Sequence, residues 1–120
     1  MIKPAYKFPA FLRLRDSSQI KDVLENAKKY RDNNLSVFVK PNDLDYPRLA
    51  VIIANKYVAK AVQRNRIKRL VRESFRLNQS QITGYDIVVF GYRGIENFSN
   101  IKLLQCLIKN WQRFGYYPEK

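Results

Sequence analysis

Apolar residues return every three to four positions after Asp16, a period typical of an amphipathic helix. The pattern predicts a first helix that begins at Asp16 or Ser17, because Asp16 with Gln19 three residues later resembles a capping pair. The helix is expected to end near Lys28 and Lys29, whose positive charges suit the negative end of the helix dipole. Its apolar positions are Ile20, Val23, Leu24 and Ala27.

Period-two alternation and short apolar runs predict strands in three further places. Residues 35–40 alternate, the apolar run at 48–54 predicts a central strand covered on both faces, and residues 85–90 form a strand after the break at Gly84. A short extended segment around residues 30–31 precedes them. In the first of the three strands, one face carries Leu35, Val37 and Val39, and the other carries Ser36, Phe38 and Lys40.

Helical spacing returns at residues 65–78 and 97–114. The element order is therefore α-β-β-β-α-β-α, which predicts an α/β fold, an α+β sandwich, with a central mixed sheet of about four strands packed with three helices. We expect one domain over residues 1–120, with residues 1–15 as an extended arm that packs through aromatic side chains. Those side chains are Tyr6, Phe8 and Phe11. In the helix at 65–78, the core side is Ile67, Leu70, Val71, Ser74 and Asn78, with Phe75 and Leu77 at its margins. In the helix at 97–114, the apolar stripe is Ile101, Leu104, Ile108 and Trp111, with Leu103, Leu107 and Phe114 beside it.

The excess of basic over acidic residues says more about function than the length of the chain does. The 120 residues contain 23 Lys and Arg but only 10 Asp and Glu, which gives a net charge of +13. Because such an excess repels itself in the folded state, a polyanionic partner is expected, either nucleic acid or an anionic membrane surface. No apolar run approaches the ~20 residues of a spanning helix, and the N-terminus is a poor signal peptide. The single Cys106 is read as a buried thiol, and a cytoplasmic location is the default.

Several kinds of active site are not expected in this chain. It has no histidine, so the usual general base at neutral pH is missing, and one cysteine cannot build a structural zinc site. Asp43 and Asp45 lie between two prolines and are read as solvated turn formers. No phosphate-binding loop motif is present. We therefore expect no catalytic residue, no metal ligand and no independent enzymatic activity.

The helix at residues 65–78 carries positive charge opposite its apolar stripe. Glu73 is the only acid in this segment, so the repulsion between its neighbouring cations is barely offset, which favours a polyanion-binding face over a merely soluble one. Arg64 falls on the core side if the helix is extended backward, so either the helix starts after it or its side chain reaches around the edge. Asn65 could serve as a local N-cap. The positive side carries Asn65, Lys68, Arg69, Arg72 and Arg76, with Arg66 near one edge.

Phe38 lies on the polar face of its strand, between Ser36 and Lys40. From the residues alone, a stacking platform for an unpaired base and ordinary core packing under a helix are both open. RNA suits the chain better than duplex DNA, because the basic helix is pinned to a sheet that carries aromatics.

Residues 64–76, RNRIKRLVRESFR, resemble the signature of the protein subunit of bacterial ribonuclease P. The similarity extends to residues 61–62, to residues 85–89 with Arg93-Gly94, and to Phe8-Pro9 with residues 13–15, so that it covers nearly the whole chain. The resemblance implies a left-handed crossover between parallel strands around the basic helix, whereas the general rule predicts a right-handed one.

The resemblance also implies a function. The protein would bind the catalytic RNA of ribonuclease P and the 5′ leader of precursor tRNA, and assist endonucleolytic removal of that leader. The RNA would carry the chemistry with Mg²⁺ that it mainly binds itself, and the protein alone would bind none. No DNA or membrane partner is implied. A structural ribosomal protein and a metal-dependent nuclease acting alone remain the alternatives from other classes.

Site residues follow from the same resemblance, position by position. Ile20 and Leu24 stand where many members have phenylalanines, and residues 55–59 replace a stretch that often holds two lysines and a glycine. The residues expected to contact the catalytic RNA are Arg64, Asn65, Arg66, Lys68, Arg69, Arg72, Arg76, Lys56 and Lys60, and those expected to contact the leader are Phe38, Ser36, Lys40, Ile20, Arg13 and Arg15.

Overall fold

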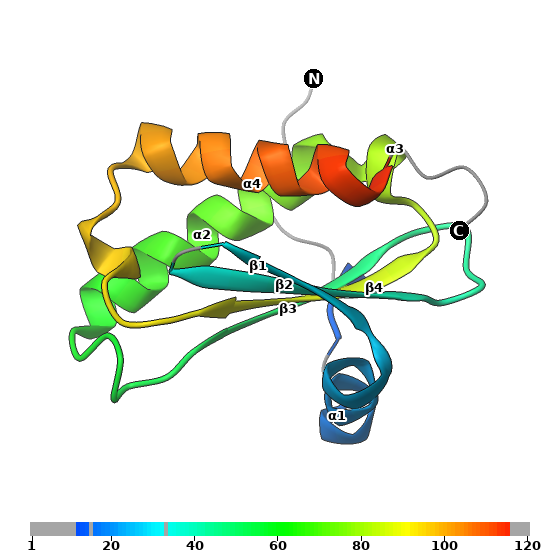
Figure 1. Ribbon diagram of the computed structural model, residues 1–120, viewed down its shortest axis with the longest axis horizontal. Coiled ribbons are helices and arrows are strands. Elements are labelled where there is room, and N and C mark those ends of the chain that lie inside the picture. The colour runs from blue at the N-terminus through cyan, green and yellow to red at the C-terminus, as the bar shows by residue number, and fades with distance from the viewer. Residues whose placement is uncertain (1–11, 15, 33, 116–120) are drawn as a thin grey trace.

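The computed structural model describes residues 12–14, 16–32 and 34–115, in which a four-stranded sheet carries helices on both faces (Figure 1). The predicted order of the main elements is confirmed, with a short helix and a 3₁₀ turn in addition. The expected contacts of the arm residues 1–11 and the position of Arg15 lie outside the described residues. The elements are α1 Ser17–Asn26, β1 Lys28–Asp32, β2 Leu35–Pro41, β3 Arg48–Ile53, α2 Ala61–Leu77, α3 Gln79–Ile82, β4 Tyr85–Gly91, the 3₁₀ turn η3 Ile95–Asn97, and α4 Asn100–Gly115.

The strand order is β1-β2-β4-β3, so β4 lies between β2 and β3. It pairs antiparallel with β2 and parallel with β3, and α2 lies in the connection between the two parallel strands. The prediction of a central strand at residues 48–54 is wrong, because β3 is at the edge of the sheet. Its apolar character arises because both faces of β3 are packed and because the arm bridges its open edge, where the Leu14 amide donates to the Leu49 carbonyl at 2.9 Å. The left-handed sense of the crossover stays a prediction.

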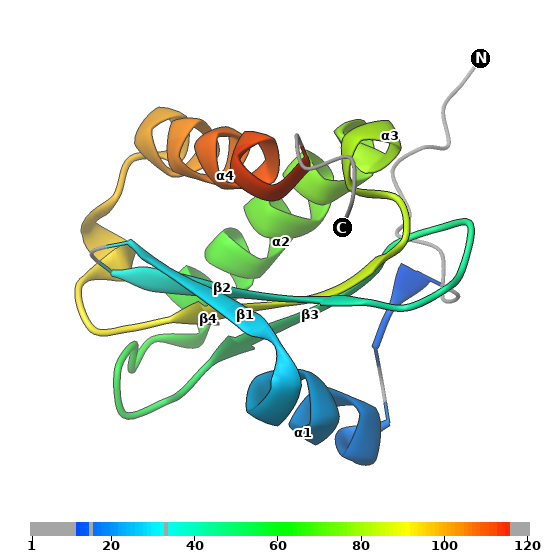
Figure 2. The ribbon, with the colours of Figure 1, turned by 45° about the vertical axis from the view of Figure 1, so that its right-hand side comes forward.

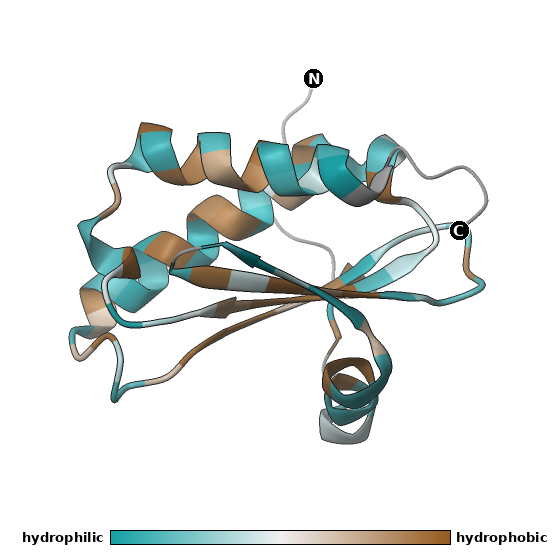
Figure 3. Ribbon diagram, in the orientation of Figure 1, coloured by the Kyte–Doolittle hydropathy of each residue, from teal (hydrophilic) through white to brown (hydrophobic). Residues whose placement is uncertain are grey.

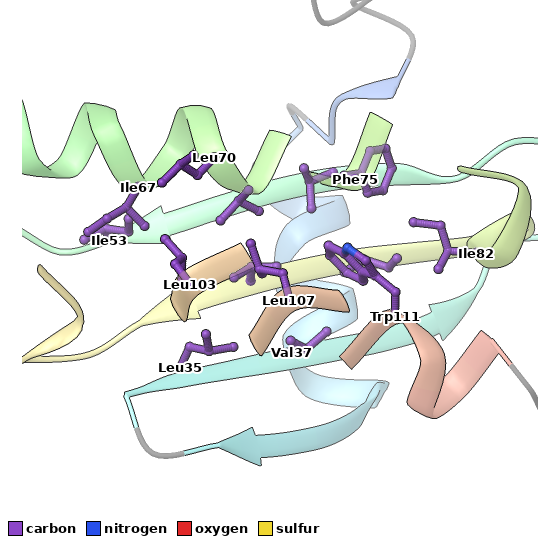
Figure 4. Close-up of a cluster of buried hydrophobic side chains, with 14 of the residues drawn as sticks. Leu35, Val37, Ile53, Ile67, Leu70, Phe75, Ile82, Leu103, Leu107 and Trp111 are labelled. Carbon is purple, nitrogen blue, oxygen red and sulfur yellow. The ribbon is translucent and has the colours of Figure 1, made fainter. Parts of the chain in front are cut away.

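Helices α2 and α4 cover one face of the sheet and α1 packs on the opposite face (Figures 1 and 2). Hydrophobic positions follow β2, β3 and β4 but not the hydrophilic β1, and they alternate with hydrophilic positions along α2 and α4 (Figure 3). The larger core lies between the sheet and these two helices, and Figure 4 shows Trp111 reaching into it from α4. A smaller cluster joins α1 to the other face through Val23, Ala50 and Val88.

Helix α1 begins as predicted, with Asp16 as its N-cap, whose side chain accepts a hydrogen bond from the Ser18 amide at 3.0 Å. The expected end near Lys28 and Lys29 is wrong, because both residues belong to β1. Strand pairing with β2 takes over there, since Lys28 and Lys29 lie opposite Val39 and Phe38. The predicted extended segment around residues 30–31 is the middle of this strand.

Helix α2 starts at Ala61, four residues before the predicted start at residue 65. The interpretation of Asn65 as an N-cap is therefore wrong, since Lys60 takes that position and makes no side-chain capping bond. The predicted core side is largely confirmed, but Leu77 is 71% exposed. The buried residues of α2 are Ile67, Leu70, Val71, Ser74 and Phe75.

Helix α4 starts at Asn100, and residues 95–97 form the 3₁₀ turn that precedes it. The predicted apolar stripe is wrong in part, because Ile101 is 70% and Ile108 41% exposed, whereas Leu103 and Leu107 are buried. Trp111 is buried as well, and its indole nitrogen donates to the Ser74 hydroxyl of α2 at 2.8 Å. This bond fixes the contact between the two helices that cover the same face of the sheet.

Candidate nucleic-acid interface

The cations of α2 form a stripe with four-residue spacing, which we call the basic stripe: Arg64, Lys68, Arg72 and Arg76. All four are partly exposed. Residues spaced by four lie above one another on a helix, so their charges share one side of α2. The neighbouring row, in which all three residues are exposed, contains Asn65, Arg69 and Glu73. The predicted positive side of α2 is therefore present. Its most exposed row includes Glu73, four residues from Arg69, whereas the basic stripe contains cations alone.

The basic stripe lies on the β3 side of α2. Arg72 lines a cavity of about 340 Å³ together with Arg13 of the arm, Ile20 of α1 and residues 49–52 of β3. Burial lowers the pKa of Arg72, and the positive charge of Arg13 lowers it further. Because an arginine stays charged at any working pH, the two guanidinium groups repel each other across this cavity. An anion placed between them would relieve that repulsion.

Arg64 resolves the alternative left open by the sequence. The helix starts before it, and the side chain turns back so that Nη1 donates to the carbonyls of Val58 at 2.9 Å and Ala59 at 2.8 Å. These bonds hold the end of the β3–α2 loop, which also presents the exposed side chains of Lys56 and Lys60. Arg64 thus shapes this loop in addition to carrying charge.

Arg66 faces away from the basic stripe, toward α4. Its guanidinium donates to the Asn100 side chain at 2.6 Å, to the Glu96 carbonyl at 3.0 Å and to the Gln63 side chain at 3.0 Å. The predicted position near one edge is confirmed. Arg66 joins α2 to η3 and the start of α4, and three of its hydrogen bonds are committed to the protein itself.

Three of the expected leader residues, Ser36, Phe38 and Lys40 of β2, lie on the sheet face that α1 covers, which we call the α1 face. Phe38 is half-buried and packs against the same buried cluster as Ile20 and Leu24 of α1, and the Lys29 ammonium lies 5.5 Å from the centre of its ring. Lys40 forms an ion pair with Asp22 of α1 and so ties this helix to β2. Phe38 is therefore partly packed and partly accessible, and its role as a stacking platform stays a prediction.

Ser36 does not present its hydroxyl to a ligand, because the residue is fully buried. Its hydroxyl shares a hydrogen bond of 2.9 Å with the Tyr92 hydroxyl. Tyr92 therefore occupies the surface above this position.

The comparisons with known proteins identify the family of the chain. The family described as Ribonuclease P matches residues 8–115. The chain belongs to this family. It is 42% identical over 106 residues to the ribonuclease P protein component of Methylococcus capsulatus (88% of this chain, 83% of the relative) and 41% identical over 113 residues to that of Pseudoalteromonas atlantica (94% of each). A solved structure of the RNase P protein from Thermotoga maritima, in complex with 1-(4-fluorophenyl)-2-thiourea, is 30% identical with a TM-score of 0.77, over 84% of this chain and 98% of that one.

Membership of the ribonuclease P family defines the activity in which the chain takes part. Ribonuclease P is the endoribonuclease that processes the 5′ leaders of precursor tRNA, and this chain is a protein subunit of that ribonucleoprotein. Within the described residues, no helix is both long enough and apolar enough to cross a membrane.

The described part of this ribonuclease P protein contains no group of three or more His, Cys, Asp or Glu side chains placed to hold a metal ion. Asp43 and Asp45 are exposed in the β2–β3 loop, as expected for turn formers. Cys106 is half-buried, and its thiol donates to the Asp32 carboxylate at 3.1 Å. Burial, with a smaller effect from Asp32, raises the pKa of Cys106 to about 12, so the thiol stays protonated at neutral pH.

Sequence reasoning missed an aromatic cluster at the far end of the α1 face of this ribonuclease P protein. Tyr57, Phe90 and Tyr92 contact one another there, with ring centres 5.0 to 6.4 Å apart. One signal was available, since Phe90 follows Val88 at the two-residue spacing that places both on one face of β4. Tyr57 and Tyr92 lie in loops beyond the strand ends, where alternation gives no information.

Proposed function

We propose that this chain binds the catalytic RNA of ribonuclease P through α2 and holds the 5′ leader of precursor tRNA on the α1 face. Residues 1–120 act as one RNA-binding domain, in the cytoplasm, with these two RNAs as partners and neither DNA nor a membrane. The observation that carries the proposal is the position of the basic stripe. It borders β3, where the arm, α1 and α2 meet, so that one RNA on α2 and another on the α1 face can be bound at once.

The α2 side supplies charge for the catalytic RNA. Lys68, Arg69, Arg72 and Arg76 neutralise phosphates, and the arginines among them can bind phosphate oxygens in pairs. Asn65 adds an exposed amide on the same helix. Four further candidates lie around the start of α2 and add positive charge there: Arg64, Arg66, Lys56 and Lys60. Arg64 and Arg66 also make hydrogen bonds within the protein.

The α1 face supplies the leader site. The accessible part of the Phe38 ring stacks on an unpaired base, and Ile20 packs beside it. Arg13, Arg15 and Lys40 add charge for the leader phosphates, with Lys40 shared with Asp22. Ser36 acts indirectly, by holding Tyr92 in place.

The protein contributes no catalytic group to the reaction in this proposal. The catalytic RNA performs the hydrolysis with Mg²⁺ ions that it mainly binds itself. The chain has no histidine, and its described residues contain no acidic cluster suited to a metal. The protein instead raises the affinity for precursor tRNA and offsets phosphate repulsion, an effect that matters most when Mg²⁺ is scarce.

The test is cleavage of precursor tRNA at low Mg²⁺ by a bacterial ribonuclease P RNA, with and without the protein. We expect cleavage at the mature 5′ end only when both are present. A control without RNA distinguishes a nuclease acting alone, because cleavage by the protein itself would overturn the proposal. Folded protein that gives no stimulation of an RNA active at high Mg²⁺ would equally reject it, and would favour a structural RNA-binding role.

A further inference from the structure

Phe90 belongs to the same sheet face as Phe38, and its ring contacts those of Tyr57 and Tyr92; we call these three residues the aromatic platform. Tyr57 lies at the margin of this face, because it also packs against the helix-side core. In the pairing register, Ser36 lies opposite Phe90, and Phe38 lies opposite Val88. Phe38 and Phe90 are therefore diagonal neighbours across adjacent strands, about 7–8 Å apart. This distance corresponds to about two base steps of a stacked strand at ~3.4 Å each. One single strand can reach both residues.

Positive charge surrounds the aromatic platform. The Arg31 guanidinium lies 4.0 Å from the centre of the Tyr92 ring, and the charged groups of Lys56 and Arg93 lie 5.2 and 5.8 Å from that of Tyr57. These three residues are exposed. The acid that β4 contributes to this face, Asp86, is at the opposite end of the strand, where its carboxylate is bound by Arg48 through two hydrogen bonds of 2.8 Å.

Three chain segments hold the aromatic platform in place. The Tyr92 amide donates to the Asn34 carbonyl at 2.9 Å, and the Asn34 side chain donates to the Arg93 carbonyl at 2.7 Å. Arg93 in turn donates to the Lys56 carbonyl at 3.1 Å, which connects the turn after β4 with the β3–α2 loop. Fixed rings with nearby guanidinium groups are the features that bind unpaired bases without regard to sequence.

We infer that the aromatic platform is a second stacking site for the single-stranded leader, binding nucleotides farther from the cleavage site than those at Phe38. This inference rests on the proposed function. The leader is the occupant, rather than the catalytic RNA, because Phe90 of the platform continues the face of Phe38, whereas α2 packs on the opposite face of the sheet. The site recognises a base by its ring face and a phosphate by its charge, so it senses leader length more than leader sequence.

The test compares the double variant Tyr57→Leu/Phe90→Leu with wild type in the reconstituted holoenzyme. Leucine keeps apolar bulk but removes the ring faces, and Tyr92 with its bond to Ser36 is left intact. The substrates are a precursor whose short leader reaches only Phe38 and one with a longer leader, with mature tRNA as competitor. We expect the double variant to lose about tenfold in kcat/KM on the long leader, about 1.4 kcal/mol, because it loses the stacking of a base. It should lose little on the short leader.

Two matched variants separate the loss of stacking from a loss of structure. Tyr57→Phe keeps the ring and should behave as wild type. Tyr30→Leu removes a tyrosine that packs against the helix-side core and also lies beneath cations, and it should leave the difference between long and short leaders as in wild type. Phe90→Leu alone serves if the double variant is poorly folded by circular dichroism, and should shift the long-leader value in the same direction.

The outcomes distinguish this inference from the proposed function. If wild type fails to prefer even the short-leader precursor over mature tRNA, leader binding itself is wrong and the inference falls with it. If that preference holds but the platform variants treat long and short leaders as wild type does, the inference alone is overturned. Weaker binding of the variants to the bare catalytic RNA, with leader dependence unchanged, would assign the aromatic platform to that RNA and also overturn it.

Discussion

At the scale of single residues, the cations of this chain divide into those that face solvent and those that hold the fold. Arg72 faces another cation, Arg13, across a cavity, and its pKa is lowered by burial and by that charge. Arg66 instead spends three hydrogen bonds on α2, η3 and α4. Equal formal charge therefore does not imply an equal contribution to RNA binding.

Replacing Arg72 with glutamine should weaken binding to the catalytic RNA by about tenfold and reduce the slope of log K against log salt by about 0.7–0.9, as expected for one lost phosphate contact. Titrations of the catalytic RNA over a range of salt concentrations measure both. Lys109→Gln, on the exposed side of α4, is the matched control and should change neither by a comparable amount. An unchanged slope for Arg72→Gln would remove this residue from the interface.

Ser74→Ala should lower the free energy of unfolding by about 1–3 kcal/mol, because the buried Trp111 indole loses the acceptor of its 2.8 Å hydrogen bond. Urea denaturation measures the change. Ser80→Ala, at an exposed position of α3, should stay within about 0.5 kcal/mol of wild type. Equal stabilities of the two variants would show that the bond contributes nothing.

At the scale of elements, α1 depends on two acidic residues. Asp16 caps its first turn, and Asp22 pairs with Lys40 of β2. The hydrogen bonds from Ser18 hold the pKa of Asp16 below its ordinary value, and the bond from Lys40, with a further one from Asn26, does the same for Asp22. A carboxylate whose pKa is lowered by folding stabilises the folded state above its unfolded pKa, and this contribution is lost as the pH falls through the folded value.

We therefore expect α1 to loosen from the sheet in acid, below the ordinary carboxyl pKa of about 3.9, before the larger core responds. Backbone amide chemical shifts of α1 and α4, followed through a pH titration, measure the order of events. Asp16→Asn should keep the cap and remove its share of the pH dependence, since asparagine caps about as well as aspartate. Asp22→Asn should loosen α1 already at neutral pH. Simultaneous changes in α1 and α4 would contradict this expectation.

Periodicity predicted the elements well where apolar and polar positions recur regularly along the chain. The core side of α2 and the alternation of β2 follow directly from the sequence, as does the cap at Asp16. The central position given to β3 was wrong because an edge strand covered on both faces has the same apolar run as an interior one. The stripe of α4 was wrong because hydrophobicity cannot reveal that Asn110 is buried, where its amide bonds the Cys106 carbonyl at 2.9 Å, while Ile101 is exposed.

The site was predictable in composition and less so in arrangement. The sequence identified the cations of α2, but their division into the basic stripe, the Arg66 contacts and the Arg64 contacts depends on where the helix starts and on what lies beside it. The aromatic platform depends on contacts between residues more than thirty positions apart, which a local pattern does not contain.

At the scale of the whole molecule, a net charge of +13 opposes the compact state by self-repulsion. Multivalent anions should therefore stabilise the free protein more than chloride at the same ionic strength. Binding to the folded state alone adds about 2.7 kcal/mol at a hundred times Kd, so the thermal midpoint should keep rising with sulfate concentration. Midpoints that depend on ionic strength alone, regardless of the anion, would show that simple screening accounts for the effect.

The place of β4 between β2 and β3 also has a consequence for how the chain is made. During synthesis β3 and the basic helix leave the ribosome before β4, the strand that pairs with β3 and joins it to the β1–β2 hairpin. Until residue 91 has emerged, the sheet cannot close, and the apolar side of α2 has no complete sheet on which to pack. Such long-range pairing makes folding slow and leaves apolar surface exposed meanwhile. A nascent chain stopped before β4 would thus lack the strand on which the whole sheet closes, rather than lose only its last helix.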